Sequence, residues 1–218
     1  MDLLKIYHLL LSHFGYQNWW PGETRYEVVI GAVLTQNTSW KNVEKAIENL
    51  KKENLIDEIK ILNTDIEKLK KLIKPAGFYN IKAERLKNIT KFIVENYKNT
   101  ENLAKLSIKL EDLRKEILNV KGIGKETADS ILLYALDREI FVIDAYTRRI
   151  FSRLRIIEGG EEYDEIRGIF EKNLPKDLKI YKEYHALIVE LGKHYCKKKN
   201  PVCEKCPLHN LCDGICKS

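Results

Sequence analysis

The sequence lacks the features that mark membrane, secreted and repeat proteins. No stretch approaches the roughly 18 consecutive apolar residues of a membrane helix. The first residues lack the charged start and the small-residue cleavage site of a signal peptide. A convincing alternation of apolar and polar residues is also missing, and so is any internal repeat. We therefore expect an all-α protein that resides in the cytoplasm and has no membrane partner.

What the sequence does contain is enough apolar material for a core and a moderate excess of positive charge. Of its 218 residues, 44% are hydrophobic and 32% are charged, and the formal net charge is +6. This length suits one large domain or two small ones. A basic bias of this size fits a nucleic-acid partner, although many soluble proteins share it.

Two glycines interrupt a helical pattern near the centre of the chain. The turn 121–124 reads Lys-Gly-Ile-Gly, and glycine permits positive φ and the close approach of another backbone. After the turn, apolar residues recur at the helical period, at Ala128, Ile131, Leu132 and Ala135. The stretch 113–136 therefore predicts a helix, a hairpin and a second helix over 125–136, and the exposed N–H groups of such a hairpin suit a phosphate oxygen. Glycine turns between helices are common, so the hairpin alone is weak evidence.

A short apolar run, 140–143, leads directly to Asp144. A carboxylate at this place can stabilise positive charge that develops on a reacting group. It can also simply cap the helix that begins at Ala145, which the sequence predicts to continue to 157. The two roles are compatible, and we take Asp144 as the candidate catalytic residue.

The three tryptophans lie close together in the sequence. Trp19 and Trp20 are adjacent in a loop, and Trp40 begins a predicted helix over 40–52. Large aromatic rings in a loop suit the stacking of a nucleic-acid base. Alternatively, the adjacent pair plugs the seam between two subdomains.

Two further loops interrupt the helical pattern. The polar turn 35–38 abruptly ends an apolar helix and contains Gln36, and by itself it can be only a joint between helices. The loop 74–80 contains proline, glycine and Phe78, and this ring can equally be a core plug beneath the loop.

All five cysteines lie near the C-terminal end. Six, two and five residues separate Cys196, Cys203, Cys206 and Cys212, and Cys216 falls outside this pattern. In a cytoplasmic protein such a cluster favours a metal over disulfides. Four thiolates bind either zinc or an iron–sulfur cluster, and their number does not decide between the two.

The hairpin 121–124, the helix after it and Asp144 together resemble the helix-hairpin-helix-Gly/Pro-Asp superfamily of DNA glycosylases, of which endonuclease III is the best-known branch. The cysteine spacing is that of the [4Fe-4S] loop in the endonuclease III group. The resemblance implies an all-α, two-subdomain helix-hairpin-helix fold with an iron–sulfur loop at 196–212. It places a helical barrel domain at 25–137, including the motif at about 113–136, and a second domain at 1–24 plus 138–218.

The resemblance also implies roles for single residues. Asp144 becomes the catalytic carboxylate, Gln36 fills the gap left by a flipped base, and Phe78 wedges into the base stack. The other residues expected to contact DNA are Tyr79, Asn80, Lys121, Gly122, Ile123, Gly124, Lys125, Thr127 and Lys193. The expected cluster ligands are Cys196, Cys203, Cys206 and Cys212, with Cys216 a non-ligand. The family often holds a monovalent cation at the hairpin. The expected partner is nucleoid DNA that contains a damaged base. The protein is expected to bind it as a monomer.

Glu126 sets this sequence apart from the family members that also cut the DNA strand. Those members carry a lysine two residues past the second hairpin glycine, and its amine forms a Schiff base with the sugar. A carboxylate cannot do so, and the neighbouring Lys125 is rotated by about 100° on a helix. We therefore expect a monofunctional glycosylase that uses water and has weak or absent lyase activity, although Lys121 could substitute.

Glu126 and the tryptophans resemble the 3-methyladenine DNA glycosylase branch in particular. Alkylated purines such as 3-methyladenine carry positive charge, and tryptophan faces attract cations. We expect hydrolysis of the N-glycosidic bond of such purines. The expected base pocket consists of Trp19, Trp20, Trp40 and Glu126.

Three alternatives differ in chemistry. A glycosylase for mismatched uracil or thymine would need hydrogen-bond donors for a neutral pyrimidine, which Gln36 or Asn37 could supply. A bifunctional glycosylase/lyase of the endonuclease III type would need another amine as nucleophile. A non-catalytic iron–sulfur protein that binds DNA and senses redox state would need only the hairpin and the cysteines.

Overall fold

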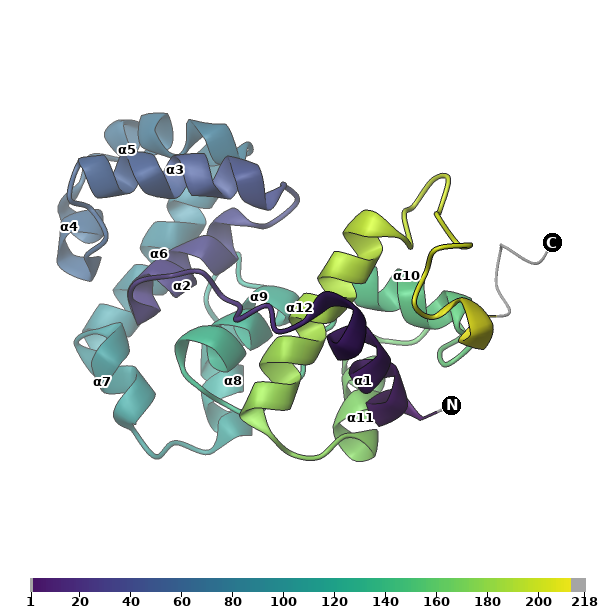
Figure 1. The fold of residues 1–218 in the computed structure, drawn as a ribbon. Coiled ribbons are helices and arrows are strands. Elements are labelled where there is room, and N and C mark those ends of the chain that lie inside the picture. The colour runs from purple at the N-terminus through teal and green to yellow at the C-terminus, as the bar shows by residue number, and fades with distance from the viewer. Residues whose placement is uncertain (1, 213–218) are drawn as a thin grey trace. The chain divides into compact units, whose positions relative to one another are not determined.

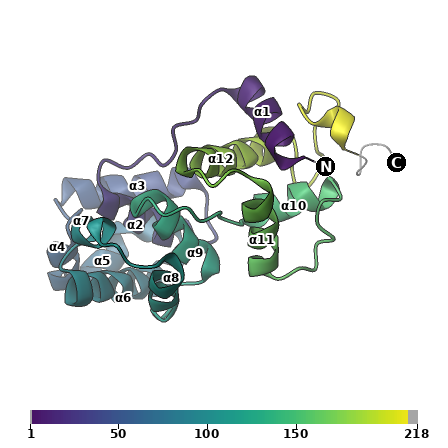
Figure 2. The same ribbon diagram turned by 90° about the horizontal axis from the view of Figure 1, so that it is seen from below.

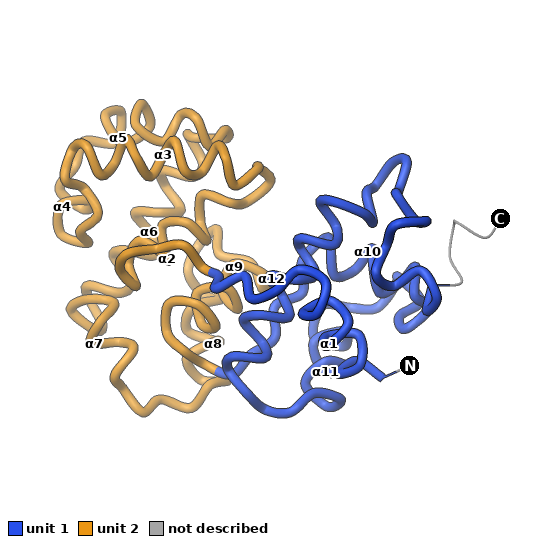
Figure 3. The backbone as a smooth tube through the Cα atoms, viewed as in Figure 1, with its two compact units in different colours: residues 1–19, 139–218 blue, residues 20–138 orange. Residues whose placement is uncertain are grey.

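The computed structural model describes residues 2–212, and helices and turns account for all of the regular structure in that range (Figure 1). The all-α prediction is confirmed. No helix of this described part is long and apolar enough to span a bilayer. The chain forms two compact units, one of residues 1–19 with 139–218 and one of residues 20–138 (Figure 3).

The unit of residues 20–138 is built around α2 (Arg25–Leu34). Every residue of α2 after Arg25 is buried, as expected for a helix that is apolar on all sides. It packs against α3, α6, α7, α9 and η2 (Figures 1 and 2). The other helices of this unit are α3 (Trp40–Lys52), α4 (Glu58–Asn63), α5 (Ile66–Leu72), η1 (Lys74–Ala76), α6 (Tyr79–Tyr97), α7 (Thr100–Lys105), α8 (Leu110–Leu118), α9 (Lys125–Ser130) and η2 (Ile131–Ala135).

The unit formed by both ends of the chain is built around α12 (Leu178–His194). This helix lies beside α1 (Leu3–Phe14) and α10 (Ala145–Arg153), and α11 (Tyr163–Asn173) packs near α1. The core of this unit is aromatic. The rings of Phe141 and Phe170 stack with centroids 4.3 Å apart, and Tyr184 packs edge-on against both. A short 3-10 turn, η3 (His209–Leu211), follows in the cysteine loop.

Two helix predictions are wrong in detail. The single α-helix predicted over 125–136 changes at Ile131 into the wider π-helix η2, where the Leu136 N–H donates to the Ile131 carbonyl, five residues back. Arg25 donates to the carbonyl of Ala135, the last residue of η2, at 2.5 Å. The helix predicted to continue to 157 ends at Arg153, because the chain turns back at Arg155, whose φ is 55°.

Candidate functional site

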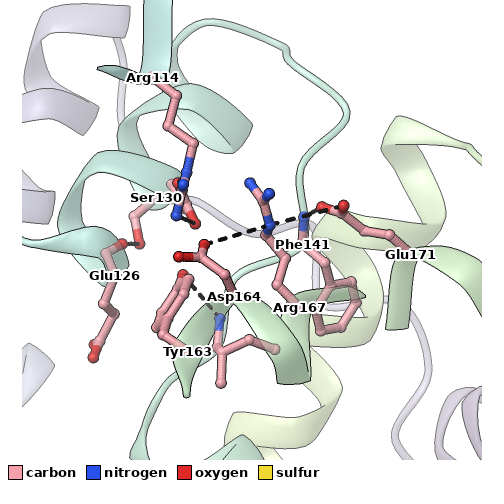
Figure 4. A network of polar contacts seen from close by, with 10 residues as sticks. Arg114, Glu126, Ser130, Phe141, Tyr163, Asp164, Arg167 and Glu171 are labelled. Carbon is pink, nitrogen blue, oxygen red and sulfur yellow. Dashed lines mark hydrogen bonds and ion pairs between the residues drawn. The ribbon is translucent and has the colours of Figure 1, made fainter. Parts of the chain in front are cut away.

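The segment that leads to Asp144 is fixed by side chains of α11. Residues 140–143 are buried without regular hydrogen bonding. The Phe141 N–H donates to Glu171 Oε1 at 2.9 Å, and the Ile143 N–H donates to the Tyr163 hydroxyl at 3.2 Å (Figure 4). These two bonds hold the backbone immediately before Asp144.

The Asp144 carboxylate is the N-cap of α10. Its Oδ1 accepts hydrogen bonds from the Thr147 N–H at 2.7 Å and from Thr147 Oγ1 at 2.8 Å. Its Oδ2 lies 3.5 Å from His185 Nε2. Asp144 is only 9% exposed. Capping therefore occupies one oxygen, while the other is directed toward an imidazole.

Burial and hydrogen bonding act in opposite directions on Asp144. Burial by itself raises the pKa of this carboxyl. The hydrogen bond and charge of His185, together with the two donors of Thr147, outweigh burial, so the pKa of Asp144 lies below its ordinary value. The carboxylate is therefore ionised at neutral pH.

Trp19 belongs to the same unit as Asp144 and lies near its imidazole partner. The ring centroids of Trp19 and His185 are 5.9 Å apart. Lys193 Nζ lies 5.6 Å from the Trp19 ring and 2.8 Å from Glu190 Oε1. Of the predicted site residues, Trp19 therefore lies beside His185, and Lys193 lies beside the Trp19 ring.

In the other unit, the hairpin has the backbone that its glycines predict. Gly122 has φ 92°, and Gly124 is the N-cap of α9. Ile123 is buried, whereas Lys121, Lys125 and Glu126 are exposed. Beneath the hairpin, Arg114 forms a buried two-bond pair with Asp129, at 2.6 and 3.1 Å, and Ser130 Oγ donates to the Glu126 carbonyl at 2.7 Å (Figure 4).

Both ends of the Gln36 amide are held, the nitrogen by the hairpin and the start of α9 and the oxygen by α6. Its Nε2 donates to Thr127 Oγ1 at 2.8 Å and to the Gly122 carbonyl at 3.4 Å. Its Oε1 accepts from Arg85 Nη1 at 2.5 Å. Asn88, one turn further along α6, donates to the Lys121 carbonyl at 3.1 Å. The structure thus brings Gln36 together with Gly122 and Thr127.

Phe78 is not a core plug, because 65% of it is exposed and its backbone is left-handed with φ 47°. It directly precedes α6, whose first residues are Tyr79 and Asn80. One turn later lies Lys82, which is 1% exposed and whose Nζ donates to the carbonyls of Leu34 and Ala76, both at 2.8 Å. Burial lowers the pKa of Lys82 to about 8. This lysine joins the ends of α2 and η1, which precede the Gln36 and Phe78 loops.

The tryptophans of the predicted base pocket are divided between the units. The rings of Trp20 and Trp40 are perpendicular with centroids 5.3 Å apart, and Tyr134 lies 5.3 Å from the other side of Trp20. Trp20 also covers Gly31, where an added Cβ would lie 2.9 Å from the indole nitrogen. Trp20 and Trp40 are therefore together in one unit, and Trp19 belongs to the other.

The four cysteines of the predicted ligand set line one cavity, together with Arg153 and His209. Burial raises the pKa of the Cys206 thiol, and Cys196 and Cys212 add to the shift. Cys196, Cys206 and Cys212 are free thiols. Within residues 2–212, no three His, Cys, Asp or Glu side chains are already gathered as a metal site. Cys216 lies outside the described residues.

Two arginines of α10 donate hydrogen bonds to the first residues of the cysteine loop. Arg149 Nε donates to the Cys196 carbonyl at 2.9 Å. Arg153 Nη1 lies 3.2 Å from Cys196 Sγ and donates to the Lys197 carbonyl at 2.8 Å. The helix that begins at Asp144 is therefore attached to the first predicted ligand.

Several residues around these sites were not found from the sequence. Thr147 carries a usable signal, because it lies three residues after Asp144, where an N-cap acceptor finds its donor. His185 and Arg85 carry none, because each meets its partner only through the fold, 41 residues from Asp144 in one case and 49 residues from Gln36 in the other.

Comparison with known proteins places this geometry in a family. Residues 30–176 match the sequence model of the HhH-GPD superfamily base excision DNA repair protein. A Methanocaldococcus jannaschii protein, provisionally named a DNA repair glycosylase, is 67% identical over 210 residues, which are 96% of this chain and 95% of that protein. Endonuclease III of Thermotoga maritima is 31% identical over 188 residues, 86% of this chain and 82% of that protein.

Solved structures agree. The H. pylori 3-methyladenine DNA glycosylase bound to 1,N6-ethenoadenine is similar with a TM-score of 0.78 and 34% identity, over 88% of this chain and 98% of that one. An endonuclease III–DNA complex shares the fold, with a TM-score of 0.82 at 20% identity, over 97% and 94% of the two chains. The extent of these matches, over a hairpin and an aspartate that the structure positions as described, makes this chain a member of the HhH-GPD superfamily of base excision DNA repair proteins.

Proposed function

We propose that this protein is a monofunctional DNA glycosylase that hydrolyses the N-glycosidic bond of alkylated purines such as 3-methyladenine. Breaking that bond develops oxocarbenium-like positive charge on the deoxyribose. A buried carboxylate that remains ionised stabilises such charge. The observation that carries the proposal is Asp144, a buried carboxylate with a lowered pKa, whose Oδ2 lies outside the helix cap and beside His185.

Hydrolysis by water, rather than attack by an enzyme amine, is supported by Glu126. This residue occupies the first turn of α9, where the strand-cutting relatives have their lysine. A carboxylate there cannot form a Schiff base with the sugar. Lyase activity is therefore expected to be weak or absent.

The preference for alkylated purines is supported by the paired indoles and by one relative. Trp20 and Trp40 offer perpendicular ring faces within one unit. Such faces attract a cationic base and stack on any base. The relative that is 34% identical is a 3-methyladenine DNA glycosylase bound to a modified adenine.

DNA would be held by the hairpin and by the loops around it. Gly122 and Gly124 expose backbone toward a phosphate, with Lys121 and Lys125 adding positive charge. Gln36 and Phe78 lie in loops of the same unit, where they would fill the gap and wedge the stack. We also propose that the backbone carbonyls of the hairpin bind a monovalent cation.

A [4Fe-4S] cluster suits the cysteine cavity. The donor set of Cys196, Cys203, Cys206 and Cys212 is all sulfur, and Arg153 lies beside Cys196 Sγ, where its positive charge would offset that of a thiolate. When bound, the cluster would brace the cysteine loop, and it takes no part in hydrolysis.

The test is base release from methylated duplex DNA by the wild-type protein and by Asp144→Asn, with chromatography of the free bases. We expect release of methylpurines by the wild type, a loss of at least 100-fold in the variant, on the order of other single electrostatic contacts to a transition state, and retained DNA binding. Release of uracil without methylpurine would refute the substrate. A borohydride-trapped protein–DNA adduct would refute the hydrolytic mechanism.

A further inference from the structure

We propose that Arg85 binds a DNA phosphate at the hairpin and, until DNA arrives, holds Gln36 against the hairpin. The inference rests on the proposed function, since it concerns how a damaged duplex is engaged. It adds a side chain of α6 to the DNA-binding surface and gives Gln36 two states.

Arg85 lies directly on the hairpin. Its aliphatic stem covers Gly122 so closely that a Cβ added to this glycine would lie 2.4 Å from Arg85 Cγ. Its Nη1 reaches past the turn to Gln36 Oε1 at 2.5 Å. The side chain is partly exposed. A positive charge therefore stands beside the turn whose backbone is proposed to meet the DNA strand.

Gln36 satisfies only part of the hydrogen-bonding capacity of the Arg85 guanidinium. A guanidinium has five N–H donors in a fork that fits the oxygens of a phosphate. The only partner recorded for it in the described part of the chain is one neutral amide oxygen. A phosphate offers an opposite charge and two oxygens that can accept a parallel pair of hydrogen bonds from the guanidinium, whereas the amide offers one neutral oxygen. A phosphate at the hairpin would therefore compete successfully for Arg85.

Loss of Arg85 would loosen Gln36. Three contacts now hold the amide, and the one to Arg85 is the only one with a charged group. The contact to the Gly122 carbonyl is long, at 3.4 Å. Once Arg85 turns to a phosphate, Gln36 keeps one short hydrogen bond, to Thr127 Oγ1. Binding of a DNA phosphate by Arg85 thus weakens the attachment of Gln36, which can then leave the hairpin and enter the duplex.

The first experiment measures the salt dependence of binding to a duplex that contains a stable abasic-site analogue. We compare the wild type with Arg85→Met, which keeps an unbranched apolar stem over Gly122, and with Gln36→Ala. Each phosphate contact contributes a slope of about −0.9 to log K against log salt. We expect Arg85→Met to lose one such contact, Arg85→Lys to retain it, and Gln36→Ala to keep the wild-type slope.

The second experiment follows 2-aminopurine placed opposite the abasic-site analogue, whose fluorescence reports whether a side chain has filled the gap. We expect Arg85→Met to keep or increase the change in fluorescence at saturating protein, because Gln36 is no longer held on the hairpin, and Gln36→Ala to abolish it. An unchanged salt slope in Arg85→Met would show that Arg85 only props Gln36, and would overturn the inference. If the wild type itself failed to prefer the abasic duplex over an intact one, the proposed function would fall instead.

Discussion

At the scale of single residues, Asp144 must be both buried and ionised. Burial removes water and opposes the charge, whereas the Thr147 donors and His185 favour it, and the second effect is the larger. A carboxyl whose folded pKa lies below its unfolded value of about 3.9 stabilises the protein above that pH. This stabilisation is lost as the pH falls through the folded pKa.

The variant Thr147→Val tests this balance, because it removes one donor to Asp144 Oδ1 and keeps the shape of the side chain. We expect destabilisation of about 1.5–3 kcal/mol at neutral pH, typical of a hydrogen bond to a charge. The loss should shrink as the pH falls through the folded pKa, since a protonated Asp144 binds Thr147 less strongly. The acid limb of single-turnover base release should move to higher pH.

A control comes from Thr90, whose buried hydroxyl contacts Tyr26 and the Leu86 carbonyl but no carboxylate. Denaturant titrations of Thr90→Val should show a loss that changes little between neutral and acid pH. If Thr147→Val behaved in the same way, Asp144 would not owe its ionisation to Thr147.

At the scale of elements, Lys82 connects the helices that carry the DNA-contacting loops. Its folded pKa of about 8 lies below the ordinary value of about 10.4 for lysine. Between these values the unfolded chain binds a proton that the folded protein does not, so this residue makes stability rise with pH. In Lys82→Met that contribution is gone. We expect the stability of the wild type relative to the variant to increase by up to about 3 kcal/mol across this range.

The measurement is urea unfolding of both proteins at several pH values, with Lys91→Met as a control. Lys91 lies on α6 as well, but its ammonium is exposed and its pair with Glu95 is long, at 3.6 Å. If the free energies of unfolding of the wild type and of Lys82→Met changed with pH in parallel, Lys82 would have an ordinary pKa in the folded protein.

The elements also show where sequence reasoning stops. The bounds of α3 follow from the spacing of apolar residues and agree with the prediction. The hydrogen bond from Arg25 to the end of η2 was missed because it joins residues 110 positions apart. The hydrogen bond between Arg85 and Gln36 was missed for the same reason. The periodicity of apolar residues indicates which residues are buried. The hydrogen-bond partners of polar side chains depend on contacts that form only in the folded chain.

At the scale of the whole molecule, the chain is divided into two units that each bury their own core. The cysteine loop belongs to the same unit as Asp144, and it is attached to α10 through Arg149 and Arg153. The unit of residues 20–138 contains no cysteine. Removal of the proposed cluster should therefore affect one unit far more than the other.

Cys206→Ser tests this difference, because Cys206 is central to the proposed ligand set. We expect loss of bound iron and of visible absorbance, and faster amide hydrogen exchange in α10 and α12, whose contacts with the loop depend on Cys196. Exchange in α2 and α6 should stay near wild type, since these helices belong to the separately packed unit. Cys216→Ser is the matched control and should keep iron, because Cys216 is predicted not to be a ligand. Equal loss of protection in both units would show that the cluster stabilises the protein as one cooperative body. Iron retained in Cys206→Ser but lost in Cys216→Ser would instead exchange the two cysteines in the ligand set.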